Sequence, residues 1–166
     1  YSTKIYMGDI VTQGTGGTIT RIARADGGGA TSAIILGVFN GCYYTDPTTS
    51  KPTWSNHWPG NAATDAVGFI IDDPYVVFEV QADAAMPVAD LFGNFDIVDQ
   101  STVGDTTSGR SNVELDVSTG ATTASLPLKA IGISTDPQNS DVATANTNVL
   151  CLIQNHLYRQ AQVGLA

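Results

Sequence analysis

The chain has 166 residues and a formal net charge of −9, with 42% hydrophobic and only 14% charged residues. Proteins that bind phosphate backbones or anionic lipids use clustered Lys and Arg, and this sequence has no such cluster. We therefore expect no nucleic-acid and no membrane partner. Lys and Glu are scarce, whereas Asp, Thr, Gly and Val are abundant. Because these abundant types favour turns and strands, the composition predicts an all-β fold, and the length predicts one β domain over residues 1–166.

Short apolar or alternating runs, separated by clusters of Gly, Pro, Asn and Asp, predict strands along the whole chain. In chain order we expect strands at residues 4–12, 18–24, 33–39, 67–71, 75–82, 113–117, 126–134 and 147–154. This spacing is typical of a compact β-barrel or a jelly-roll-like sandwich with long loops rich in Gly, Thr and Asp. Residues 1–7 are a candidate for an extended N-terminal arm.

The segments between these strands read as loops, at residues 12–18, 25–32, 44–65 and 100–112. The 44–65 segment is long for a loop without secondary structure of its own, and such loops are usually functional or mobile. Residues 83–93 are the one stretch that suits a helical turn or two, with an irregular loop as the alternative.

Two strands carry distinct patterns. In "VELDV" (113–117), the alternation places Val113, Leu115 and Val117 on one side, as in a half-buried strand. "NVLCLIQ" (148–154) does not alternate, which suits a central strand covered on both faces or one buried in a subunit interface. Cys42 and Cys151 both lie in strand-like sequence, and we interpret them as buried free thiols, with a single disulfide as the alternative.

Two adjacent carboxylates interrupt the most apolar run, "FIIDDPYVVFEV" (69–80). Pro74 removes a backbone donor and restricts Asp73, and Asp side chains accept hydrogen bonds from nearby backbone amides. We therefore interpret Asp72 and Asp73 as part of a corner between two strands. A metal or acid/base site would need further convergent groups that the sequence does not indicate.

Familiar catalytic and cofactor motifs are absent from the sequence. There is no G-x-S-x-G, no G-x-x-x-x-G-K-[ST] and no H-E-x-x-H, and "GTGGT" (14–18) precedes β-type residues and not a helix. The two histidines, His57 and His156, are too few for a cupin-like metal site. We expect no enzymatic activity, no catalytic residue, no metal and no cofactor.

The long loop holds the best binding candidates. Large amphipathic aromatic side chains anchor protein interfaces or stack on sugar rings. We therefore name a candidate partner or ligand contact set of Tyr43, Tyr44, Trp54, His57 and Trp58. Three interpretations stay open: the tryptophans fix the loop onto the fold, they form a protein interface, or they form a saccharide platform.

The order of several segments resembles small β-rich structural proteins of tailed bacteriophage virions, most closely capsid decoration (cement) proteins. The segments that carry this resemblance are "YMGDIV", "ILGVFNGCYY", a P…W…PGN loop, "IIDDPYVVFEVQAD", "GRSNVELD" and "LPLKAIGIS…NTNVLCLIQNHLY". They cover nearly the full chain but contain no catalytic signature.

The resemblance implies a compact β-barrel or jelly-roll-like fold and no enzymatic activity. It further implies a virion protein, assembled in the bacterial host cytoplasm, on the outer surface of the capsid. The expected partners are the major capsid protein, contacted by one face or by the segment before Gly8, and two further copies in a homotrimer. The alternative is a carbohydrate- or receptor-binding β-domain of a phage tail or tail fibre.

Overall fold

The structure is a computed structural model that describes residues 1–22, 34–139 and 141–159. Over these residues the chain forms strands joined by antiparallel ladders and three single-turn 3-10 helices, and it has no α-helix. This confirms the all-β class. The loop expected at 25–32, and the ends of the neighbouring strands at 23–24 and 33, lie outside the described residues.

The chain divides into two compact units. Unit 1 consists of Tyr1–Ile22, Leu36–Asp72 and Gln100–Val113, and unit 2 of Ala23–Ile35, Asp73–Asp99 and Glu114–Ala166. The long strands β9 (Asn94–Asp105) and β10 (Arg110–Ala121) contribute residues to both units, so neither unit is one continuous stretch of chain. The expectation of a single domain over 1–166 stays a prediction.

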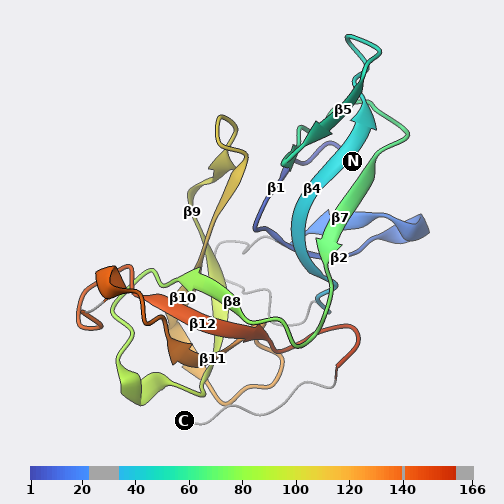
Figure 1. Ribbon diagram of the computed structural model, residues 1–166. Coiled ribbons are helices and arrows are strands. Elements are labelled where there is room, and N and C mark those ends of the chain that lie inside the picture. Colours follow the sequence, from blue (N-terminus) through green and yellow to red (C-terminus); the bar gives the residue numbers. More distant parts are fainter. Residues whose placement is uncertain (23–33, 140, 160–166) are drawn as a thin grey trace. The chain divides into compact units, whose positions relative to one another are not determined.

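Unit 1 is built around β4 (Gly37–Thr45). β4 lies beside β5 (Pro52–Ser55) and β7 (Val67–Ile71) (Figure 1) and also pairs with β2 (Ile10–Gln13). The register places β2 and β5 on one edge of β4 and β7 on the other. β3 (Ile19–Arg21) extends the sheet beyond β2, and the 3-10 turn η1 (Thr15–Gly17) connects these two strands. Unit 1 also contains a two-stranded sheet of β1 (Ile5–Tyr6) and β6 (His57–Trp58), together with the end of β9 and the start of β10.

The N-terminal segment is part of the core of unit 1. Ile5 and Tyr6 are only 2% and 4% exposed, and they pair with Trp58 and His57 in β6. Ile5 joins a buried cluster with Val11, Phe39, Cys42, Tyr44 and Trp58. Of the candidate arm at 1–7, residues 5 and 6 are therefore integrated into a sheet.

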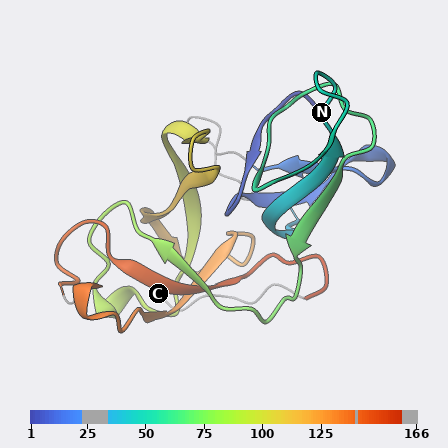
Figure 2. The same cartoon turned by 45° about the horizontal axis from the view of Figure 1, so that its top comes forward.

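Unit 2 contains a sheet with the strand order β10-β9-β11-β12-β8, to which β8 (Phe78–Gln81), β11 (Leu128–Ile133) and β12 (Asn148–Ile153) contribute fully. β12 runs between β8 and β11, and both views show it beside β8 (Figures 1 and 2). Val149, Cys151 and Ile153 are almost fully buried, whereas the alternate residues are half-buried. β12 is thus an interior strand with one buried face and one partly covered face. Two 3-10 turns, η2 (Val88–Asp90) and η3 (Pro137–Asn139), lie in the connections.

Two segments that we expected to be loops contain strands. The 44–65 segment holds the last two residues of β4 together with β5 and β6, and the 100–112 segment holds the end of β9 and the start of β10. Only a short turn, held by Asp105 accepting from the amides of Thr107 and Ser108, separates β9 from β10. The loop interpretation was wrong because these segments pair across strands: β5 with β4, β6 with β1, and β9 with β10. Such cross-strand pairing stabilises strands that also contain Ser, Asn and Gly.

A substitution of Leu115 tests whether this residue lies in the core of unit 2. Its side chain is fully buried (0% exposed) in β10, and truncation leaves a cavity among packed neighbours. We expect Leu115→Ala to lower the free energy of unfolding by about 2–5 kcal/mol in a urea titration followed by circular dichroism. Val88→Ala, at a 62% exposed position, is the matched control and should change it by less than about 0.5 kcal/mol. Equal effects of the two substitutions would contradict the buried position of Leu115.

Candidate functional site

An exposed apolar surface covers one side of the β5–β4–β7 part of unit 1. Tyr43 on β4 lies directly opposite Trp54 on β5 and Val67 on β7, and paired residues in a ladder project to the same side. Strand alternation adds Phe69 and Ile71 of β7 to this side. The exposed fractions are 44% for Tyr43, 60% for Trp54, 56% for Val67, 46% for Phe69 and 36% for Ile71. We call these five residues the apolar face.

Gly41 explains how Trp54 is held on this face. A Cβ atom at position 41 would lie 3.0 Å from Cζ2 of the Trp54 indole and 2.9 Å from the carbonyl oxygen of Ser55. Gly41 also has a φ of 120°, in the region that favours glycine. The indole thus lies against a bare stretch of β4 backbone and keeps an open side toward solvent. A side chain at position 41 would displace the Trp54 ring from this place.

The other two large aromatic residues of the predicted contact set point inward. Tyr44 and Trp58 are each 6% exposed and pack in a T-shaped arrangement with ring centroids 5.4 Å apart. The indole Nε1 of Trp58 donates to the backbone carbonyl of Tyr1 at 2.8 Å. The structure therefore divides the set, because Tyr43 and Trp54 lie together on the surface and Tyr44 and Trp58 lie together in the core.

His57 occupies an intermediate position beneath the strand edge. Its ring stacks on Tyr6 with centroids 5.7 Å apart, and its Nδ1 lies 3.3 Å from the hydroxyl of Ser55 and 3.3 Å from the side-chain oxygen of Asn56. Burial lowers the pKa of His57 below its ordinary value of 6.5, and the charge of Lys4 lowers it further. The folded state thus favours the neutral imidazole, which stacks on Tyr6, its partner in the β1–β6 sheet.

This shift predicts a pH dependence of stability. Because the pKa of His57 is lower in the folded than in the unfolded chain, its contribution is fully present above pH 6.5 and is lost as the pH falls through and below 6.5. We expect the urea midpoint, followed by tryptophan fluorescence, to fall between pH 7.5 and pH 5.5. The fall should be smaller in His57→Gln, and an identical fall in both proteins would assign the dependence to other groups.

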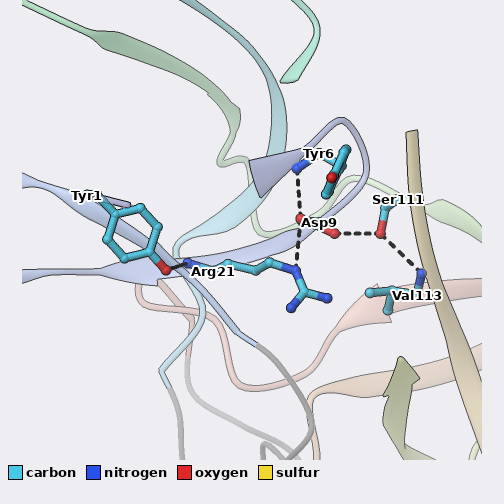
Figure 3. A network of polar contacts seen from close by, with 6 residues as sticks. All are labelled: Tyr1, Tyr6, Asp9, Arg21, Ser111 and Val113. Carbon is cyan, nitrogen blue, oxygen red and sulfur yellow. Dashed lines mark hydrogen bonds and ion pairs between the residues drawn. The ribbon is translucent and has the colours of Figure 1, made fainter. Parts of the chain in front are cut away.

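A buried ion pair ties together three distant segments of unit 1 (Figure 3). The Asp9 side chain is 0% exposed and the Arg21 side chain 3% exposed, with Nε of Arg21 2.9 Å from Oδ2 of Asp9. The same oxygen accepts from the backbone amide of Tyr6 at 2.8 Å, and Oδ1 accepts from the hydroxyl of Ser111 at 2.5 Å. The Ser111 hydroxyl in turn accepts from the amide of Val113 at 3.1 Å.

Sequence reasoning did not identify this network. Burial raises the pKa of Asp9, while the hydrogen bonds from Ser111 and Tyr6 and the charge of Arg21 act in the opposite direction. Because the Asp9 side chain is completely buried, it does not reach solvent or a substrate. Its role is to hold β1, β3 and β10 together, and a separation of 102 residues between Asp9 and Ser111 left no local signal in the sequence.

Asp72 and Asp73 are exposed and lie between β7 and β8. Oδ1 of Asp73 accepts from the backbone amide of Tyr75 at 2.9 Å, and the amide of Val76 donates to the Asp73 carbonyl at 3.3 Å. These bonds form the turn that the Asp-Pro sequence indicated. The Asp73 side chain thus stabilises the local backbone turn.

Cys42 and Cys151 are free and buried, which confirms their interpretation as buried thiols. Burial raises the pKa of Cys42 to about 11 and that of Cys151 to about 12, so both are protonated and unreactive at neutral pH.

Over residues 1–22, 34–139 and 141–159, no group of three or more His, Cys, Asp or Glu side chains is placed to hold a metal ion. None of the helices in that part of the chain has the length and apolar character needed to cross a bilayer.

Comparison of the chain with protein families, with curated proteins and with solved structures gives no match. The candidate sites are therefore identified from the structure alone, and they are the apolar face and the buried Asp9 network. Of the two, only the apolar face is accessible to another molecule.

Proposed function

We propose that this protein is a phage capsid decoration protein that binds the outer surface of the head and stabilises contacts between major capsid protein subunits. In this proposal the protein works as a homotrimer in the virion and catalyses no reaction. A jelly-roll-like or barrel arrangement of the strands is part of the same proposal.

The observation that carries the proposal is the apolar face. Five large apolar side chains are exposed side by side on paired strands, whereas single scattered apolar residues are the rule on monomeric surfaces. Ladder pairing of β5 and β7 with β4 holds the backbone of this face in place, so little conformational entropy is lost when it binds. Rigid apolar contact is what a protein that fastens shell subunits together requires.

The copy number of the protein in virus particles tests the proposal. We expect stained gels or mass spectrometry of purified particles to show this chain in numbers comparable to the most abundant shell protein, because a role across the whole lattice requires many copies. A few copies per particle would place the protein in the tail. Its absence from particles would overturn the proposal.

A second candidate function, saccharide binding, is favoured by one particular pair of residues. Tyr43 and Trp54 are directly opposed on neighbouring strands and both are exposed, which presents two aromatic rings to a flat ligand. In a glycan-array experiment, this candidate predicts binding that is lost in Trp54→Ala. Val88→Ala, which changes an exposed residue in unit 2, is the control and should leave any glycan binding intact. Absence of binding by the unsubstituted protein would exclude this candidate.

A further inference from the structure

The outer edge of β7 is an open sheet edge. β7 pairs with β4 through Val38, Phe39, Cys42 and Tyr43, and no strand among the described residues pairs with its other side. Its sequence, VGFII, contains no charged residue and no proline, although these are the usual means by which proteins protect a sheet edge. Three of its five residues, Val67, Phe69 and Ile71, belong to the apolar face, so the edge and the face form one continuous surface.

Carboxylates stand at both ends of this strand. Asp65 precedes β7, and its two oxygens accept from the amide and the hydroxyl of Thr45 at 3.1 and 2.6 Å. These bonds lower the pKa of Asp65, so it is ionised at neutral pH. Asp72 follows β7 directly and is exposed. Lys51, the nearest basic residue in the sequence, precedes β5, which pairs with the opposite edge of β4.

This charge distribution opposes pairing of two copies through β7. In an antiparallel pair that overlaps β7 with β7, Asp65 of one copy lies opposite Asp73 of the other and next to its Asp72, and this happens twice because the pair is symmetric. Like charges opposite each other on neighbouring strands are destabilising. The net charge of −9 adds further repulsion between copies.

We propose that the β7 edge binds an extended segment of another protein that is apolar at alternate positions and carries Lys or Arg at both ends. Main-chain hydrogen bonds to β7 would add this segment to the sheet as a new strand. Its alternate side chains then lie beside Val67, Phe69 and Ile71 and extend the apolar face, while its basic ends lie near Asp65 and Asp72. This inference does not depend on the capsid function, because it follows from the edge, the face and the charges alone.

The test uses a synthetic peptide of the stated chemistry and the full chain. A fluorescently labelled KKVTVTVKK peptide is titrated with the protein and followed by anisotropy, in parallel with EEVTVTVEE. We expect saturable binding of the Lys peptide, weakened by salt, and affinity lower by about ten-fold or more for the Glu peptide. Backbone NMR shifts caused by the Lys peptide should centre on residues 67–71.

Two variants separate edge binding from general attraction to an acidic protein. Phe69→Lys places a charge on the exposed side of β7 and should abolish binding, whereas Val88→Lys adds the same charge at an exposed site in unit 2 and should retain it. If Phe69→Lys does not fold by circular dichroism, Asp72→Asn replaces it and should weaken binding of the Lys peptide.

Three results would overturn the proposal. The first is equal binding of both peptides, and the second is NMR shifts spread over acidic loops outside β7. The third is a concentration-dependent dimer in sedimentation that Phe69→Lys abolishes, because this would assign the edge to a second copy of the chain.

Discussion

Asp9→Asn is expected to lower the free energy of unfolding of the protein by about 3–5 kcal/mol, because it leaves the guanidinium of Arg21 buried without its counter-charge. The substitution also weakens the hydrogen bonds that Asp9 accepts from the Tyr6 amide and the Ser111 hydroxyl, which connect it to β1 and β10. Urea unfolding followed by tryptophan fluorescence measures this effect in unit 1 specifically, since both tryptophans, Trp54 and Trp58, belong to that unit.

Two further variants give this prediction its controls. Asp65→Asn removes a carboxylate that also accepts two hydrogen bonds but is exposed, and its effect should be much smaller than that of Asp9→Asn. In the double variant Asp9→Leu with Arg21→Met, both charges are absent, and much of the lost stability should return. A loss below about 1 kcal/mol in Asp9→Asn would show that Arg21 finds water or another partner when Asp9 is neutral.

The strands that the sequence predicted well have a strong local pattern. The 67–71 strand coincides with β7, and the strands at 126–134 and 147–154 contain β11 and β12, because each is rich in apolar or β-branched residues between turn residues. The prediction of one continuous strand at 4–12 was wrong, because Gly8, with a φ of 100°, lies in a break that separates β1 from β2. The missed strand β9 is polar toward its end, where pairing with other strands outweighs propensity.

Of the apolar face, the sequence analysis named Tyr43 and Trp54 but not the three residues of β7. Adjacent strand residues alternate between faces, so the "YY" of β4 already implies that one tyrosine is exposed and the other buried. The two tryptophans are four residues apart, and only the break between β5 and β6 sends Trp54 outward and Trp58 inward. The buried Asp9 network depends on contacts between distant segments, which a single sequence does not reveal.

Because Trp58 lies in the core and Trp54 on the surface, we expect the loss of stability on substitution by alanine to differ greatly between the two tryptophans. Trp58→Ala removes a 6% exposed side chain from the core cluster, together with its contact to Tyr44 and its hydrogen bond to the Tyr1 carbonyl. We expect the free energy of unfolding to fall by about 3–5 kcal/mol. Trp54→Ala, at a 60% exposed position, should lower it by less than about 1 kcal/mol, although it uncovers Gly41.

Each variant keeps one tryptophan, so its fluorescence and the circular dichroism of the whole chain can both follow urea unfolding. The emission maximum of the Trp58→Ala protein should lie at longer wavelength than that of Trp54→Ala, because the remaining Trp54 is exposed to water. Similar losses of stability in the two variants would contradict the assignment of one ring to the core and the other to the surface. If the difference is as large as expected, Trp54→Ala is a folded protein with an altered apolar face, and any binding that it loses is lost at that face.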